Sequence, residues 1–232
     1  MVTKLAEEKE SKAREAMKMM GLRDHSYYVA WAMVLAFLVG IMSVLIVGTL
    51  SLQTLKQSDL GLVFGMCFLY GMNLYGVSFA ITAWLPSKKS SATAASLIHL
   101  LSYYIAFAYS GYTASATTKQ IVALVPNCAM AFSIQHLFNS EFEGSGLTYE
   151  MASMEFQNFS FIKGLYMLMI DFVLWSLVGL YFDQTAPRQF GTSKPWTFPL
   201  TYFFRSRSSS VTDFDLGPEK QNQQLVAKGN FE

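Results

Sequence analysis

The sequence is poor in charged residues. Asp, Glu, Lys and Arg make up 14% of its 232 residues, against about 25% in soluble domains, whereas 52% of the residues are hydrophobic. The formal net charge is only +1, so no nucleic-acid partner is expected. This composition argues against a soluble domain and predicts a membrane protein.

Residues that carry catalysis or bind metals are also scarce. The sequence has no G-x-x-x-x-G-K-[ST] loop, so it does not bind nucleotide by that route. His25, His99 and His136 are scattered, and no cysteine stands at metal-ligand spacing from any of them. No pairing of a nucleophile with a base is apparent. We expect no catalytic residue, cofactor or metal in this chain.

Cysteine is limited to Cys67 and Cys128. The first lies in the middle of a long apolar run and the second lies in a segment expected outside the membrane. Because the two differ in depth, disulfide geometry argues against a bond between them. We expect two free or buried thiols, although Cys128 could pair with a segment outside this chain.

Long apolar runs, by contrast, are abundant. A hydrocarbon core about 30 Å thick requires about 20 apolar residues of helix, and four segments meet this length. They are residues 27–50, 60–84, 95–112 and 161–182. Gly61, Gly65, Gly71 and Gly76 in the second run are suited to close helix packing in lipid. The predicted fold class is an all-α membrane protein with a transmembrane bundle over residues 27–182.

The basic residues gather on one side of these four runs. They lie before the first run, at Lys88 and Lys89, and after the fourth run, whereas the other side has only Lys56, Lys119 and Lys163. The positive-inside rule then places both termini in the cytosol. The chain is predicted to be a multi-pass protein of the plasma membrane or of an organelle membrane.

A fifth apolar segment, residues 120–138, is interrupted by Pro126-Asn127. A full fifth span would put the chain ends on opposite sides and move the basic tail after residue 187 outside. We therefore predict a re-entrant or interfacial helical hairpin on the outer face, since broken backbone at membrane depth is tolerated only when protein or a cavity surrounds it.

The two ends of the chain are polar. Residues 3–20 have the periodicity of an amphipathic helix, within a segment 1–22 that ends at Gly21, a helix C-cap residue. Two interpretations stay open for it: a membrane-surface or solvated helix, or a cytosolic coupling helix that leans on a partner domain. At the other end, prolines break residues 183–206, a predicted juxtamembrane segment, and residues 207–232 are predicted to be a disordered linker.

Three polar residues outside the termini are candidate sites. Asp171 lies about mid-bilayer, where a carboxylate costs about 2.5–3.5 kcal/mol to insert, and Asn73 is nearest to it in predicted depth. Asp171 could form a helix-packing hydrogen bond or could act on a transport path, and both interpretations stay open. Asn158 begins the only N-x-S/T sequon, so it is a candidate glycosylation site, with access limited by the adjacent span.

Two separated stretches carry a family resemblance. The first is Glu8-Lys9-Glu10 followed by Arg14-Glu15-Ala16-Met17-Lys18-Met19-Met20-Gly21-Leu22, with Trp31 at the next span. The second is Tyr181-Phe182-Asp183, then Pro187, Phe190-Gly191 and Lys194-Pro195-Trp196-Thr197-Phe198-Pro199. Together with a short basic turn at residues 86–92, they resemble the A subfamily of ABC transporters, the lipid-exporting branch. Arg188, Phe190 and Thr197 depart from the family pattern.

The resemblance implies that this chain is spans three to six of the first half of such a transporter. It implies a parent protein that uses ATP and Mg²⁺, with membrane lipid as substrate and nucleotide-binding domains and further spans as partners. The N-terminal helix would receive the ATPase stroke, and the residues implied in this coupling are Glu8, Glu10, Glu15, Met17, Met20 and Gly21. Residues 207–232 would lead toward a missing nucleotide-binding domain.

Two functions from different classes therefore remain. The first is a partial transmembrane domain of an ATP-driven lipid transporter, which would form part of the lipid path. The alternative is a self-standing four-span regulatory or scaffolding subunit of a membrane transporter. The size of the natural product would distinguish them. A small channel is disfavoured, because one Asp and scattered Asn and Ser residues do not supply the polar rings that line pores.

Overall fold

The computed structural model describes residues 1–85, 87–185 and 197, except the side chains of Glu15, Lys18 and Asp24. The predicted linker at 207–232 and nearly all of the predicted juxtamembrane segment lie outside the described residues.

Within the described residues, four helices are long and apolar enough to cross a membrane, as predicted. They are α3 (Asp24–Gln53), α4 (Leu60–Trp84), α5 (Lys88–Ala108) and α8 (Phe161–Thr185). Three lie close to their predicted bounds, but α5 begins seven residues before residue 95 and ends four before residue 112. Residues 88–92, expected in a turn, are therefore helical, and the chain turns at Leu85 and Ser87 instead.

The N-terminal segment forms two helices rather than the single one predicted over residues 3–20. They are α1 (Val2–Glu10) and α2 (Ala13–Met19). Lys12, between them, has a φ of +56°, a left-handed conformation that an α-helix cannot contain. The amphipathic pattern cannot reveal such a break, because the spacing of apolar residues continues across it.

The apolar segment with the internal proline forms a helical hairpin composed of α6 (Ala116–Val122) and α7 (Pro126–Phe142). Pro126 begins α7, where its missing N–H costs nothing. The turn contacts the middle of two long helices: Trp175 of α8 donates to the carbonyl oxygen of Leu124 at 3.1 Å, and Tyr70 of α4 donates to Asn127 at 2.8 Å. The hairpin is four residues longer at each end than predicted, and its place relative to the bilayer stays a prediction.

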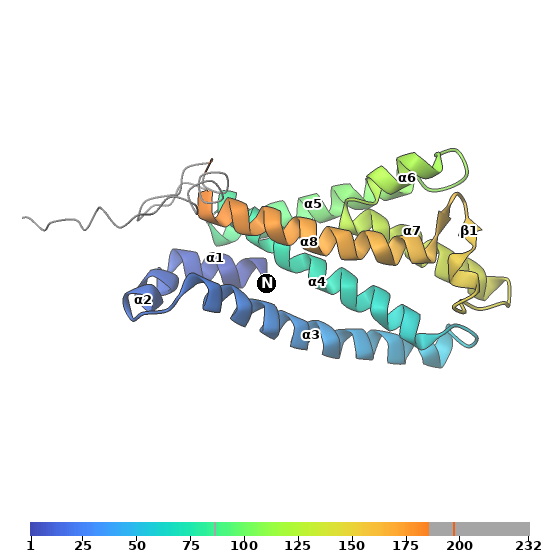
Figure 1. Ribbon diagram of the computed structural model, residues 1–232, viewed down its shortest axis with the longest axis horizontal. Helices are drawn as coiled ribbons and strands as arrows, with labels where there is room; N and C mark the ends of the chain where they lie inside the picture. Colours follow the sequence, from blue (N-terminus) through green and yellow to red (C-terminus); the bar gives the residue numbers. More distant parts are fainter. Residues whose placement is uncertain (86, 186–196, 198–232) are drawn as a thin grey trace, which may run out of the picture. The chain divides into compact units, whose positions relative to one another are not determined.

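A short hairpin that was not predicted precedes α8. After the 3₁₀ turn η1 (Met151–Ser153), strands β1 (Glu155–Phe156) and β2 (Phe159–Ser160) pair antiparallel, with Glu155 opposite Ser160. Figure 1 shows these strands at one end of the helices, which we call the β1 end, while α1 and α2 lie at the opposite end, the α1 end.

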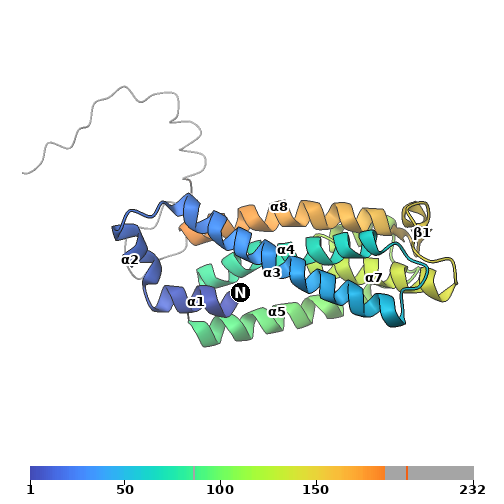
Figure 2. The same cartoon turned by 90° about the horizontal axis from the view of Figure 1, so that it is seen from below.

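Helices α4 and α8 run side by side in the same direction (Figures 1 and 2). Their contact is built on glycine: a Cβ at Gly76 would lie 2.1 Å from the backbone carbon of Trp175, and one at Gly179 would lie 2.3 Å from the carbonyl oxygen of Gly76. Gly71 packs against the side chain of Val39 in α3, where a Cβ would lie 2.4 Å from a methyl carbon of Val39. Small residues therefore bring these backbones together, as predicted for Gly71 and Gly76, whereas Gly65 has no neighbour within 4 Å.

Candidate functional site

At the α1 end, the Asp183 carboxylate near the end of α8 binds two cations from the N-terminal helices. Lys9 of α1 lies 2.8 Å from its Oδ1, and Arg14 of α2 lies 2.6 Å from its Oδ2. Asp183 and Arg14 are buried, at 3% and 4% exposed. The break at Lys12 lies between the two cations, so α1 and α2 each supply one of them.

Tyr28 of α3 completes this arrangement, which we call the Asp183 cluster (Lys9, Arg14, Tyr28 and Asp183). Its hydroxyl donates to Asp183 Oδ2 at 2.6 Å and accepts from Arg14 Nη2 at 2.8 Å. Burial alone would lower the pKa of Arg14, but the charge of Asp183 together with the interactions with Tyr28 outweighs burial and raises the pKa above its ordinary value. Arg14 therefore stays charged, and the cluster connects α1, α2, α3 and α8.

Further contacts extend this connection to α4 and α5. Lys9 also donates to the carbonyl oxygen of Thr82 in α4 at 3.0 Å, and Glu10 accepts from the backbone N–H of Lys88 at 2.6 Å. Glu8 accepts from Tyr27 at 2.7 Å and from Trp31 at 3.2 Å, both in α3. Helix α1 is thus bonded to all four long helices at one end.

The methionines at and after α2, which include the coupling candidates Met17 and Met20 and also Met19, divide into a packed residue and two exposed ones. Met17 packs against the apolar cluster that includes Tyr28 and Phe79, whereas Met19 and Met20 are 85% and 80% exposed. Gly21 follows α2 with a φ of +94°, a conformation that suits glycine. The side chain of Glu15 lies outside the described part of the chain. The end of α2, at Met19, and the residue that follows it, Met20, therefore leave apolar side chains uncovered beside the Asp183 cluster.

Halfway along the bundle, the structure places Asn73 and Asp171 at similar depth. Asn73 donates to the carbonyl oxygen of Leu168, one helical turn before Asp171, at 3.0 Å. Both polar residues are buried, at 1% and 0% exposed. Asn73 therefore contacts the backbone of α8 about one turn before Asp171, and its pairing with the Asp171 side chain stays a prediction.

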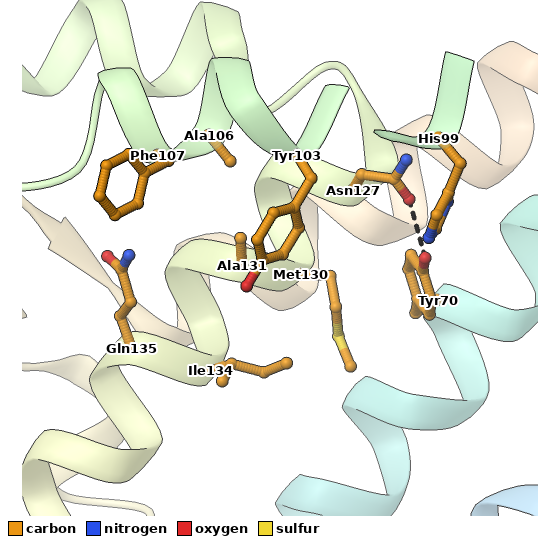
Figure 3. Close-up of a pocket in the computed structure, with 10 residues that line it drawn as sticks. All are labelled: Tyr70, His99, Tyr103, Ala106, Phe107, Asn127, Met130, Ala131, Ile134 and Gln135. Carbon is orange, nitrogen blue, oxygen red and sulfur yellow. Dashed lines mark hydrogen bonds between the residues drawn. The ribbon is translucent and has the colours of Figure 1, made fainter. Parts of the chain in front are cut away.

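A cavity of about 250 Å³ lies between α5 and α7, with Tyr70 of α4 at one side. Figure 3 shows polar groups of Tyr70, His99 and Asn127 together at one end, and Gln135 near Phe107 at the other. Met130 and Ile134 line the space between them. An apolar body with polar groups at its ends suits an amphiphilic molecule.

The sequon residue Asn158 occupies the tight turn between β1 and β2. Gln157 and Asn158 both have positive φ, at +51° and +63°, as in a two-residue hairpin of type I′. The Asn158 amide nitrogen donates to the carbonyl oxygen of Ala114 at 3.1 Å. Its glycosylation stays a prediction, and the modification would have to replace this hydrogen bond.

Sequence reasoning did not single out Asp183 as a site residue, although it lay within the resemblance. One signal was present: a carboxylate at the end of an apolar run, on the side where basic residues gather. Lys119 was also missed as a buried residue, because a lone lysine on a short helix carries no sequence signal. It is 1% exposed and donates to the carbonyl oxygen of Gln157 at 2.6 Å.

Comparisons with known proteins agree with this architecture. A family model described as ABC-2 family transporter protein matches residues 1–181. ATP-binding cassette sub-family A member 17 of Mus musculus is 26% identical over 236 residues, covering 97% of this chain and 13% of that protein. The Phospholipid-transporting ATPase ABCA3 of Rattus norvegicus is 28% identical over 221 residues, covering 86% of this chain and 12% of that protein.

A third relative, the Glucosylceramide transporter ABCA12 of Homo sapiens, is 23% identical over 228 residues, covering 95% of this chain and 9% of that protein. The chain thus spans between 9% and 13% of the length of these relatives. With four helices able to cross a membrane and a family match over most of its length, the chain belongs to the ABC-2 family of transporter proteins, as a transmembrane region of the A-subfamily type.

Proposed function

We propose that this chain forms part of the lipid path of an ATP-driven lipid transporter and receives the ATPase stroke through α1 and α2. The observation that carries the proposal is the bonding of α1 to all four long helices, centred on the buried Asp183 cluster. A rigid element bonded to several spans at one end can transmit a displacement to all of them.

Two exposed methionines, at the end of α2 and directly after it, support a contact with an ATPase domain. Met19 and Met20 are almost fully exposed beside the Asp183 cluster, and methionine is common at binding surfaces that adapt to a partner. In this proposal both chain termini are cytosolic, and ATP and Mg²⁺ bind to nucleotide-binding domains elsewhere in the transporter. This chain's own contribution is to receive and distribute the motion.

Lipid as the substrate class is supported by the cavity and by the relatives. The cavity between α5 and α7 combines apolar walls with polar ends, which suits one portion of an amphiphile. Two relatives carry names that specify a phospholipid and a glucosylceramide as cargo.

The coupling proposal is tested with Met19→Asp plus Met20→Asp in the full-length transporter, reconstituted in liposomes. Both side chains are exposed, so the fold should be retained while the apolar contact is lost. We expect ATP hydrolysis to continue and lipid export per ATP to fall by about tenfold, within the usual range of coupling between sites. The measurement is the rate of ATP hydrolysis alongside the rate of lipid transfer.

A matched control is Met154→Asp, which places the same charge on an exposed methionine at the β1 end, 56% exposed. It should leave both rates unchanged. Normal coupled export in the double variant would contradict the proposal, and so would an equal loss in Met154→Asp.

A further inference from the structure

A buried carboxyl group without a hydrogen-bond donor lies halfway along α8. Asp171 is 0% exposed, and neither of its carboxylate oxygens has a hydrogen-bond partner among the described residues. Buried polar groups in proteins are almost always paired, because an unpaired one loses its water without compensation. The protonation state in which Asp171 is buried is therefore the question that these contacts raise.

Asn73 of α4 has hydrogen-bond partners for its amide nitrogen but none for its amide oxygen among the described residues. Its amide nitrogen donates to the carbonyl oxygens of Leu69 at 2.9 Å and Leu168 at 3.0 Å, whereas its Oδ1 has no donor within the described chain. Leu168 is three residues before Asp171, so Asn73 contacts α8 within about one helical turn of Asp171. The Asn73 and Asp171 side chains thus present three oxygen acceptors and no free donor.

Among the described residues, no Lys, Arg or His forms a hydrogen bond or an ion pair with the Asp171 carboxylate. The titratable group that interacts with it is the Cys128 thiol of α7, which donates to the carbonyl oxygen of Ser102 at 3.3 Å. An ionised carboxylate without a cation is strongly disfavoured in such surroundings, because it loses its water without compensation.

We propose that Asp171 is a proton-binding site at the contact between α4 and α8, and that it is neutral in this structure, donating its O–H to Oδ1 of Asn73. One bound proton converts an unpaired oxygen of Asp171 into a hydrogen-bond donor and supplies the Oδ1 of Asn73 with the donor it lacks among the described residues. It also removes the cost of the buried charge. Release of the proton would require Asp171 to reach water or a cation, so proton binding stabilises the packed arrangement of α4 and α8.

The proposal predicts the direction of pH dependence. Since the packed arrangement holds the proton, stability contributed by Asp171 falls as the pH rises and the proton is lost. Asp171→Asn, a neutral isostere of the protonated acid, should retain the fold and remove this contribution. These expectations concern proton binding alone, so their test does not depend on whether the protein exports lipid.

The test is infrared difference spectroscopy of the full-length protein in lipid nanodiscs, comparing wild type with Asp171→Asn at neutral pH. We expect the wild type to show the C=O band of a protonated carboxyl that is missing in the variant. The control Glu155→Gln, on an exposed residue that pairs with Lys163, should leave that band in place. A second variant, Asn73→Leu, should shift the band without removing it, because the hydrogen-bond acceptor is lost and the acid remains.

Two outcomes would overturn the proposal. One is a difference spectrum that shows only an ionised carboxylate at Asp171. The other is an increase in melting temperature with Na⁺ but not with choline that is lost in Asp171→Asn, because the site would then hold a metal cation instead. If Asp171→Asn fails to fold, an unshifted protonated band in Asn73→Leu also contradicts the proposed hydrogen bond.

Discussion

At the scale of single residues, Asp183 shows how a buried charge is tolerated near a span end. It binds Lys9 and Arg14 and accepts from Tyr28. The two cations are not equivalent, because the side chain of Arg14 is 5% exposed and that of Lys9 is 22% exposed. Water can therefore replace Lys9 more easily than Arg14. The rings of Tyr27 and Tyr28 also lie 4.6 and 5.1 Å from the guanidinium carbon, adding cation–π contacts.

Arg14→Met should therefore be strongly destabilising. It keeps most of the bulk but leaves Asp183 without its buried partner, and breaking a buried pair costs about 3–5 kcal/mol. Lys9 remains, so we expect about 3 kcal/mol, measured by thermal unfolding of the purified full-length protein. The control is Lys4→Met, which breaks an exposed pair with Glu7 and should cost less than about 1 kcal/mol. Equal effects of the two substitutions would refute this ranking.

A second residue, Glu141, stabilises the loop between α3 and α4. It accepts from the hydroxyl of Ser58 at 2.5 Å and from the backbone N–H groups of Lys56 and Gln57 at 2.6 and 3.1 Å. Burial on its own would raise the pKa of Glu141, but these hydrogen bonds outweigh it and the pKa lies below its ordinary value. The carboxylate form is therefore the one that stabilises the fold.

The expected result for Glu141→Gln is a stability loss that depends on pH. Because the pKa of Glu141 is lower in the folded protein, its contribution is complete above the ordinary glutamate value of about 4.3 and is lost as the pH falls through the lowered pKa. The variant should have a lower melting temperature than wild type at pH 7. This difference in melting temperature should become smaller in acid. Glu150→Gln, on an exposed residue, is the control. A gap of equal size at all pH values would mean that charge is not the cause.

At the scale of helices, hydropathy predicted the four spans, because they must be apolar along their length. It did not predict the residues at which helices begin and break. The four spans follow from apolar length alone, since lipid permits only internally bonded helices across its core. The start of α5 at Lys88 could not be predicted from hydropathy, because the run of apolar residues begins only later. The polar residues before this run, such as Lys88, form the first turns of the helix. The hairpin of α6 and α7 was signalled by Pro126, whose effect on a helix is local and strong.

The Asp183 cluster could be predicted only in part. Its members Lys9, Arg14 and Asp183 lay in the stretches that carry the family resemblance, but their pairing joins residues 169 positions apart, a distance in sequence that no local pattern encodes. The break at Lys12 was hidden for a related reason. A left-handed residue other than glycine is held by its tertiary contacts and has no signature in apolar spacing.

The contact between α4 and α8 gives a prediction for whole helices. Gly76→Ala should separate them, because its Cβ would overlap the backbone of Trp175 and overpacking costs about 1–3 kcal/mol. Gly65→Ala is the matched control, since a Cβ there meets nothing within 4 Å and alanine favours a helix by about 1 kcal/mol over glycine. Thermal unfolding should show a lower melting temperature for the first and an equal or higher one for the second. The opposite order would rule out glycine as the basis of this contact.

At the scale of the whole molecule, charge differs between the two ends of the described bundle. The α1 end has Lys4, Lys9, Lys12, Arg14, Lys88 and Lys89. The β1 end has fewer cations, and one of them, Lys119, is buried while another, Lys163, pairs with Glu155. The positive-inside rule is a statement about such an asymmetry, and here it predicts a cytosolic α1 end.

This orientation can be measured with single cysteines in the full-length protein, expressed in intact cells with other accessible cysteines replaced. Cys67 and Cys128 are buried free thiols and should not react with a membrane-impermeant maleimide. Lys56→Cys and Glu150→Cys, on exposed residues of the β1 end, should react from outside the cell or from an organelle lumen. Lys4→Cys and Lys89→Cys, exposed at the α1 end, should react only from the cytosol. An ATPase stroke must arrive from the side where ATP is present. Labelling of Lys89→Cys from outside would show that the bundle has the opposite orientation, and coupling through α1 and α2 would lose its basis.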